Sequence, residues 1–268
     1  MANESYHTAW LKRFGYPFDG SPPRIAHLLR HRSVRSFDRS REVPEEMVRA
    51  LIGAAQSAST SSNLQLWSVI SVQEPERRDA IARLCANQDH VREAHWFFAF
   101  LVDHYRLRSA ALAAGENPSG LDYVEYFIMG LVDAALAAER MVCAAETLGL
   151  GICYIGALRN DAQGVAQLLN LPDGTFGAFG LCLGWPSPDA KSEIKPRLRP
   201  NTIWFKERYQ AETDISEYDE RMRQFYASQG MNPGVTWSMR SGKRVDDHHL
   251  TGRERLREFL LRRGFNRR

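Results

Sequence analysis

The longest helical pattern in the chain lies between Leu121 and Gly149. It is rich in alanine, leucine, methionine and glutamate and contains no proline, which favours an uninterrupted helix. Its apolar residues occupy two faces, one with Phe127, Leu131, Ala134, Ala138 and Met141 and the other with Val132, Leu136 and Val142. A helix that is apolar nearly all round must be buried nearly all round. We therefore expect this helix to form the centre of the fold and also to pack against a second copy of itself.

Short apolar runs predict the strands. Residues 96–102 (WFFAFLV) and 179–185 (FGLCLGW) show no alternation with polar residues, which is typical of strands buried on both faces in the middle of a sheet. Weaker strand patterns cover residues 67–72 and 152–155. Periodic apolar positions predict helices over residues 24–32, 44–58, 75–86, 161–169, 215–228 and 253–263.

These elements predict an α+β fold with three layers, in which helices flank a central, mostly antiparallel sheet. Residues 1–23 read as an irregular arm, because they end in a Ser-Pro-Pro breaker. Residues 24–186 form the expected core. Residues 187–268 are polar and form an expected C-terminal extension that wraps the core or a partner subunit. In its arginine-rich end, from Arg253, we expect the apolar side chains to pack and the arginines to face water.

Composition excludes several classes of protein. The chain has 268 residues, of which 44% are hydrophobic and 25% are charged, as in globular proteins. Its net charge of +3 is too mild to suggest a nucleic-acid or membrane-surface partner. The sequence contains no apolar run of about 18 residues, no secretory signal pattern and only four scattered cysteines, so we predict a cytoplasmic protein.

Two short cationic segments are candidates for anion binding. The first is His31-Arg32-Ser33-Val34-Arg35, and the second is Lys195-Pro196-Arg197. Guanidinium forks and a hydroxyl match the oxygens of a phosphate. Taken alone, the first segment is at least as well interpreted as a solvated basic turn, and the second alone would most often be surface decoration.

Two further segments could line a polar or flat ligand. Residues 57–65 (SASTSSNLQ) are dense in small hydrogen-bonding side chains, although such a stretch is often only a loop. Residues 149–157 (GLGICYIGA) surround a strand with glycine and alanine, which lets backbone N–H groups approach a ligand closely. This second pattern is not a dinucleotide-binding GxGxxG, and the helix that precedes it argues against a nucleotide-binding fold of the Rossmann type.

The sequence predicts no metal site and no catalytic triad. His248 and His249 are adjacent and would diverge on a helix, and no cysteine or acidic residue stands at ligand spacing from them. No GxSxG motif occurs. We therefore interpret most of the eight histidines as structural or exposed.

Taken together and in order, five segments resemble the nitroreductase superfamily: HRSVR at residue 31, STSSNLQLWS at residue 59, YIGALRN at residue 154, FGLCLGWP at residue 179 and KPRL at residue 195. More narrowly, the chain resembles the NAD(P)H-dependent, oxygen-insensitive nitroreductase and FMN reductase branch with a long C-terminal extension. The resemblance covers roughly residues 24–240. It implies a homodimer with the long helix at the interface and with two FMN sites between the subunits.

The resemblance also implies roles for particular residues. Those expected to hold the FMN phosphate are His31, Arg32, Ser33, Lys195 and Arg197. Arg35 would lie at the pyrimidine edge of the flavin, where a cation raises its two-electron potential. Those expected around the ribityl chain or the ring, in part from the partner subunit, are Ser59, Thr60, Ser61, Asn63, Gln65 and Gln88. Those expected to pack against the ring are Tyr154, Ile155, Gly156 and Ala157, with a backbone N–H near Gly156 aimed at N5.

The implied reaction is a ping-pong hydride transfer from NADPH or NADH, through the flavin, to a nitroaromatic, a quinone or free flavin. No side chain is expected to act as an acid or base in its main step. Residues 229–237 contain no arginine, so the resemblance does not decide between the two nicotinamide donors. Two alternatives stay open: an FMN reductase that supplies reduced flavin to a partner, and a non-catalytic flavin-binding regulatory dimer.

Overall fold

The computed structural model describes residues 5–21, 24–265 and 268, and the chain divides into two compact units. The helical unit comprises Met1–Arg32 and Ser192–Leu250, and the sheet unit comprises Ser33–Lys191 and Thr251–Arg268. These boundaries differ from the expected ones at both ends of the core. Residues 24–32 group with the polar extension, whereas the last 18 residues return to the sheet.

The sheet unit is built on four antiparallel strands in the order β1-β2-β4-β3. Their bounds are β1 Trp67–Val72, β2 Trp96–Asp103, β3 Gly151–Ile155 and β4 Thr175–Gly184. The two strands without polar alternation, β2 and β4, occupy the centre, as their sequences predict. β4 begins at Thr175, earlier than expected, because the polar and glycine positions at its start are also buried.

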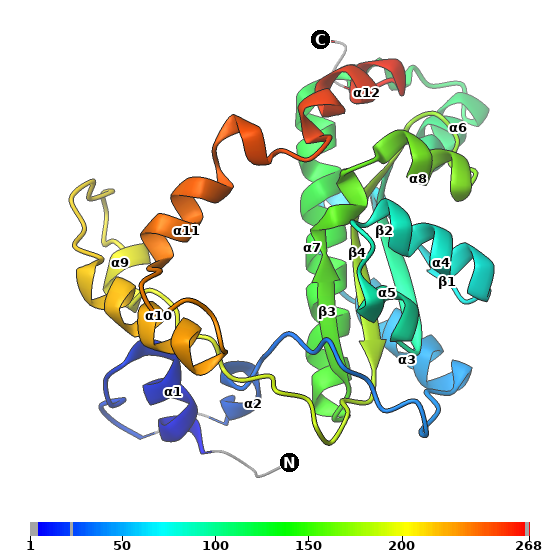
Figure 1. Cartoon of the computed structure of the whole chain (residues 1–268). Coiled ribbons are helices and arrows are strands. Elements are labelled where there is room, and N and C mark those ends of the chain that lie inside the picture. Colours follow the sequence, from blue (N-terminus) through cyan, green and yellow to red (C-terminus); the bar gives the residue numbers. More distant parts are fainter. Residues whose placement is uncertain (1–4, 22–23, 266–267) are drawn as a thin grey trace. The chain divides into compact units, whose positions relative to one another are not determined.

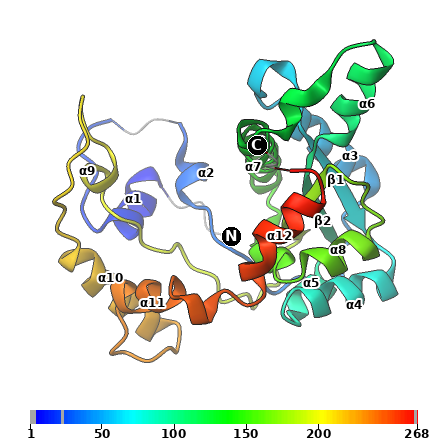
Figure 2. The same ribbon diagram turned by 90° about the horizontal axis from the view of Figure 1, so that it is seen from above.

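Helices cover both faces of this sheet. Phe98 and Phe100 of β2 pack on the layer formed by α3 (Glu45–Gln56) and α7 (Val124–Thr147), and Phe97 and Ala99 face the opposite layer. The opposite layer contains α4 Pro75–Leu84, α5 Asp89–Glu93, α8 Ala162–Leu168 and α12 Leu256–Arg262. Figure 2 shows the three layers from above. The predicted α+β sandwich is thus confirmed.

Other short elements complete the unit. They are α6 Tyr105–Ala113 and the 3-10 turns Ser61–Asn63, Pro118–Asp122, Gly156–Arg159 and Arg253–Arg255. None of the helices in the described ranges is long and apolar enough to cross a membrane.

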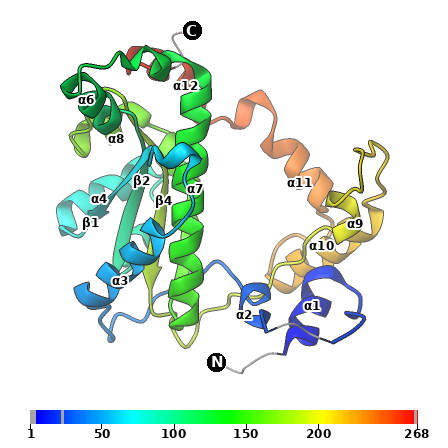
Figure 3. The same cartoon turned by 180° about the vertical axis from the view of Figure 1, so that it is seen from behind.

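The long helix α7 packs on one face of the sheet and runs in nearly the same direction as its strands (Figures 1 and 3). Gly130 lies so close to β2 that a Cβ there would meet Val102 Cγ1 at 2.6 Å, so only glycine permits this approach. The helix ends at Thr147. Two residues later, Gly149 has a φ of +84°, which glycine readily adopts, and Leu150 N–H donates to Ala145 O at 3.0 Å.

One carboxylate inside α7 fixes the polar loop before β1. Asp133 is 1% exposed, and its two oxygens accept hydrogen bonds from Ser61 N–H at 3.1 Å and Leu66 N–H at 3.0 Å. A buried carboxylate needs such partners, because burial of an unpaired charge is very costly. Asp133 therefore ties residues 61–66 to the central helix.

The helical unit contains α1 Tyr6–Phe14, α2 Ala26–Leu29, α9 Pro200–Ile203, α10 Ser216–Ser228, α11 Trp237–Arg244 and the 3-10 turn Asp247–His249. The expectation of an irregular arm over residues 1–23 is wrong for residues 6–14. Ser5 caps α1 by accepting from Thr8 N–H, and Gly15 ends it at φ +78°. The helix expected over residues 24–32 is reduced to the single turn α2.

The expectation that the arginines after residue 253 face water is also wrong in part. Arg263 donates to the carbonyls of Leu171 and Pro172, both at 2.6 Å, and pairs with Asp173 at 2.8 Å. Phe265 is fully buried against Phe127. The end of the chain is thereby anchored in the sheet unit.

Substitution of Asp133 tests the anchoring of the loop. In Asp133→Ala, the N–H groups of Ser61 and Leu66 lose their acceptor, so we expect the free energy of unfolding to fall by about 3 kcal/mol. Asp133→Asn retains one acceptor oxygen and should lose about half of that. Urea unfolding measures both. Glu116→Ala, which removes an exposed loop carboxylate, serves as the control, and an equal loss there would contradict the assignment.

Candidate functional site

The chain segment after Arg32 lies along the outer edge of β3. Ser33 forms an isolated parallel bridge with Ile152, and Val34 N–H donates to Ile152 O at 2.8 Å. Val34 is 2% exposed, whereas Arg35 is exposed. Two of the sequence-predicted site segments, residues 33–35 and 154–157, are thus brought to the same edge of the sheet.

Tyr154 is the exposed residue of β3. Its ring packs edge-on against Phe179, and its hydroxyl donates to Glu139 Oε2 of α7 at 3.2 Å. Tyr154 is 37% exposed, and the partial burial of its phenol, followed by the nearby charge of Glu139, raises the pKa of Tyr154 above its usual value. The phenol therefore stays neutral at physiological pH and serves as a hydrogen-bond donor.

The turn after β3 is held by the returning C-terminal segment. Arg253 Nη2 donates to Gly156 O at 3.1 Å, and its Nε donates to Asn160 Oδ1 at 3.0 Å. Because a trans peptide directs its C=O and N–H in opposite directions, the next N–H, that of Ala157, points away from Arg253. Arg253 thus sets the orientation of the Gly156–Ala157 peptide.

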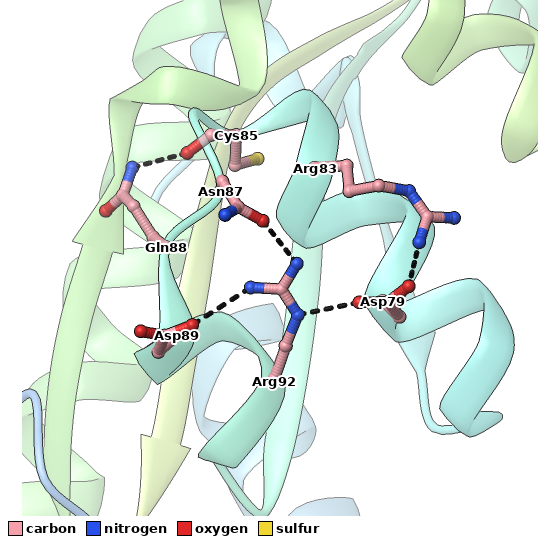
Figure 4. Close-up of polar contacts among 7 residues, drawn as sticks. All are labelled: Asp79, Arg83, Cys85, Asn87, Gln88, Asp89 and Arg92. Atoms are coloured by element: carbon pink, nitrogen blue, oxygen red, sulfur yellow. Dashed lines mark hydrogen bonds and ion pairs between the residues drawn. The ribbon is translucent and has the colours of Figure 1, made fainter.

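A second turn, between α4 and α5, presents Gln88 (Figure 4). The side-chain amide of Gln88 donates to Cys85 O at 2.7 Å. Two residues later, His90 Nε2 lies 3.9 Å from Cys153 Sγ of β3, so this turn lies beside the same strand. The pKa of His90 is lowered by burial and then by the charge of Arg35, which places Arg35 near this turn as well.

The backbone of this turn is strained. Ala86 and Asn87 have φ values of +61° and +55°, in the left-handed region that residues with a Cβ rarely adopt. Such a conformation costs on the order of 1 kcal/mol or more per residue. Strain of this kind persists only where neighbouring contacts enforce it.

The polar loop before β1 lines a cavity of about 570 Å³. Its lining includes Ser59, Thr60, Asn63, Gln65 and Arg106. Three loop residues, Ser62, Asn63 and Gln65, have left-handed φ angles between 49° and 56°. Arg106 fixes the end of the loop by donating to Gln65 O at 2.5 Å and Trp67 O at 2.8 Å.

One hydroxyl in this cavity is notable. Thr60 Oγ1 is buried and, within the described part of the chain, has no hydrogen-bond partner. A buried polar atom without a partner is unfavourable, so it marks a place where a ligand or water completes the bonding.

The sheet separates the two groups of sequence-predicted residues. The cavity adjoins β1, and Tyr154 belongs to β3, and these are the two edge strands. Three interstrand spacings amount to about 14 Å. Residues 59–65 and residues 154–157 of one chain therefore do not meet around one small ring system.

In the helical unit, the buried Arg13 donates hydrogen bonds to the backbone of both cationic segments. Arg13 of α1 is 5% exposed and donates to Lys195 O at 3.0 Å, to Leu29 O at 2.7 Å and to His31 O at 2.8 Å. Arg197 N–H in turn donates to Arg13 O at 2.7 Å. The segment that ends in His31-Arg32 and the segment Lys195–Arg197 are thus held next to each other.

The cationic residues of these two segments lie at the surface. Lys195 and Arg197 are exposed on either side of buried Pro196, and His31 and Arg32 are partly exposed. The cations expected at the phosphate therefore lie in the helical unit, whereas Arg35 lies in the sheet unit. Contact of any of these residues with a cofactor stays a prediction.

Sequence reasoning missed the residues that position these groups. Asp133, the lone carboxylate in the apolar stretch of residues 127–138, was a detectable signal, because burial would force it to find donors. The Ser5 cap and Gly15 were signals for the helix that carries Arg13. Nothing in the local sequence identified Arg253, since its acceptors lie 93 and 97 residues away. Arg92 has acceptors close by, at Asn87 and Asp89, and its further bond to Asp79 of α4 depends on how α4 and α5 pack. Within the described ranges, no group of three or more His, Cys, Asp or Glu side chains could hold a metal ion.

Several known proteins are similar to this chain in sequence and in fold. Residues 28–185 match the nitroreductase family, and residues 195–268 match the C-terminal domain of that family. The chain is 36% identical to the FMN reductase (NADPH) of Bacillus subtilis, covering 90% of this chain and 98% of that protein. It is 38% identical to the NADPH-flavin oxidoreductase of Vibrio harveyi, covering 80% and 87% of the two chains.

Solved structures of related proteins have the same fold. The NfrA1 nitroreductase from B. subtilis superimposes with a TM-score of 0.84 at 36% identity, covering 91% of this chain and 99% of that one. The NADPH:FMN oxidoreductase from Vibrio harveyi, complexed with NAD+, gives a TM-score of 0.79 at 32% identity, covering 91% and 99%. The two family matches together span most of the chain, and the fold agrees with them, so the protein belongs to the nitroreductase family.

Proposed function

We propose that this protein is an FMN-dependent oxidoreductase that transfers hydride from NADPH or NADH to nitroaromatic or quinone acceptors. The observation that carries the proposal is the cationic cluster of the helical unit. Arg13 holds the backbone of His31 beside that of Lys195, so cations from two distant segments are presented together. A phosphate monoester, which carries about two negative charges, favours such a cluster.

The residues of the chain fit FMN. His31, Arg32, Lys195 and Arg197 supply the cations for its phosphate. The loop of residues 59–65 supplies hydroxyl and amide groups for a polyol chain, and the unpartnered Thr60 Oγ1 supports that role. Tyr154 and the fixed Gly156–Ala157 peptide supply an aromatic edge and a backbone donor for the ring.

FMN, when bound, would supply the hydride-transfer chemistry. The protein would supply position and electrostatics. Arg35 places a positive charge beside the turn of Gln88 and His90, where it favours negative charge on a bound ring. Glu139 holds the hydroxyl of Tyr154 and thereby fixes its ring at the edge of β3.

We further propose that the functional form is a homodimer. Val124, Ile128, Val132 and Leu136 are spaced four residues apart on α7 and are each 45–50% exposed. An apolar stripe of this size favours a protein partner. A second copy would also bring its loop of residues 59–65 to the β3 edge of the first, which one chain cannot do because the sheet lies between them.

A second candidate function is favoured by the relatives. An FMN reductase that releases reduced flavin to another enzyme would use the same residues, and the 36% identical protein of B. subtilis is named an FMN reductase (NADPH). The two functions differ in the acceptor that turns over fastest, so steady-state rates with free FMN, a quinone and a nitroaromatic separate them.

The first prediction concerns reduction. Mixed anaerobically with NADPH or NADH, the purified yellow protein should lose its flavin absorbance within seconds, because hydride passes to the bound cofactor. Stopped-flow absorbance measures the rate for each donor and identifies the preferred one. A yellow protein that neither donor bleaches would favour a non-catalytic flavin-binding dimer. A colourless protein that does not take up added FMN would refute the proposal.

The second prediction concerns the phosphate. Arg32→Ala and Lys195→Ala should each weaken FMN binding by about tenfold or more, because each removes one charge-assisted contact. Fluorescence titration of the flavin-free protein with FMN gives the affinity. Arg24→Ala removes an exposed cation of the same unit and should leave it unchanged. Wild-type affinity in both test variants would show that the phosphate binds elsewhere.

The third prediction concerns the dimer. Leu136→Glu places a charge in the exposed stripe of α7 and should convert the dimer into a monomer that binds FMN poorly, since part of each site would come from the partner. Light scattering coupled to gel filtration gives the mass. Leu112→Glu changes an equally apolar exposed residue on α6 and should remain dimeric. A Leu136→Glu protein that stays dimeric would exclude this interface.

A further inference from the structure

The strained turn at Ala86 and Asn87 raises the question of what holds it. Neither residue is glycine, yet both adopt the left-handed conformation in succession. The turn leads directly into Gln88, whose amide must direct its NH₂ group toward Cys85 O, because a carbonyl only accepts. The Oε1 atom of Gln88 points away from this contact (Figure 4), so the group that it offers outward is an acceptor.

Arg92 of α5 holds this turn through hydrogen bonds. Its guanidinium donates to Asn87 Oδ1 at 2.5 Å, to Asp89 Oδ1 at 3.1 Å and, through Nε, to Asp79 Oδ1 of α4 at 2.6 Å. One planar group therefore connects a left-handed residue, the first turn of α5 and the preceding helix (Figure 4). The rigid fork of arginine suits this role, since a lysine could not present these donors in fixed directions.

Asp79 binds Arg92 and so connects it to α4. The carboxylate also accepts a hydrogen bond from Arg83, on the same helix. The hydrogen bond from Arg92 is the main reason that the pKa of Asp79 lies below its usual value, so the carboxylate is charged at neutral pH. Arg83 and Arg92 thus share one acceptor, but only Arg92 also bonds to the turn.

The bonds of Arg92 indicate a local role. Exposed ion pairs contribute little to global stability, and Asp79 is 40% exposed at its side chain. What distinguishes Arg92 is its bond to Asn87, which stands next to Gln88 and in the strained conformation.

We propose that Arg92 is a positioning residue that holds the Ala86–Asn87 turn and thereby aims the amide of Gln88 at the flavin. This inference rests on the proposed function, in which Gln88 lies beside the ring. Loss of Arg92 releases the turn, so that Gln88 no longer presents its acceptor in one direction.

The test compares Arg92→Ala, Gln88→Ala, the double variant and Arg83→Ala. Hydrogen exchange over residues 85–92, measured without flavin, should accelerate in Arg92→Ala and stay as in wild type in Arg83→Ala. The FMN affinity of Arg92→Ala should fall by about tenfold, as for the loss of one hydrogen bond, and its bound flavin should show the same spectral shift as in Gln88→Ala. In the Gln88→Ala background, removal of Arg92 should change the affinity less than twofold.

The outcomes separate the two proposals. Wild-type exchange in Arg92→Ala, or effects of Arg92 and Gln88 that multiply in the double variant, would overturn the positioning role while leaving flavin chemistry intact. If Arg83→Ala lost as much FMN affinity as Arg92→Ala, the cluster would act only as a surface ion-pair network. That result would also overturn the positioning role of Arg92. A wild-type protein that binds no FMN would refute the proposed function, and the positioning role would fall with it.

Discussion

The packing of α7 against the sheet is the constraint on which the sheet unit depends. Gly130 lets the helix approach Val102 of β2 closely, and buried alanines continue the contact toward its C-terminus. Close approach leaves no room for water, so the one carboxylate on this face, Asp133, must be paired within the protein. Its partners are backbone N–H groups of the loop before β1. The same contact that forms the core therefore also fixes a polar loop that lines a cavity.

The parts of the candidate site share one physical design. In each case a polar segment with an unfavourable or otherwise undetermined conformation is held by a charged side chain from another element of the structure. Asp133 and Arg106 hold the loop of residues 59–65, Arg253 holds the Gly156 carbonyl, and Arg92 holds the turn before Gln88. Charge-assisted hydrogen bonds to backbone or amide oxygens are strong and directional, so they can enforce left-handed conformations without glycine.

This design has a consequence for function. Groups that contact a cofactor need fixed directions more than they need strength, because misplacement of a donor or acceptor by an ångström weakens the interaction that tunes the ligand. In the proposed site, Asp133, Arg253 and Arg92 do not themselves offer groups to the ligand. They set the directions of those that do. In the proposed dimer, the exposed apolar stripe of α7 would pack against a second chain, whose loop of residues 59–65 would complete each site.

The sequence by itself determined the central strands, the long helix and the order of the cationic and polar segments. Residues 96–102 have no polar alternation, so their place in the middle of the sheet followed from hydrophobicity alone. The resemblance carried by HRSVR, YIGALRN and KPRL was sufficient to predict the family, which is confirmed. Local rules were sufficient here because hydrophobic periodicity and glycine act over a few residues.

Only the tertiary structure decided which charged residues hold the site together. Arg13, Arg92 and Arg253 look like ordinary surface arginines in the sequence, and the sequence around α1 is typical of an irregular arm. Their acceptors are main-chain or side-chain oxygens, and those of Arg13 and Arg253 lie as far as 182 and 97 residues away. No local pattern encodes such pairs, because a guanidinium selects its acceptors by position in space and not by distance along the chain.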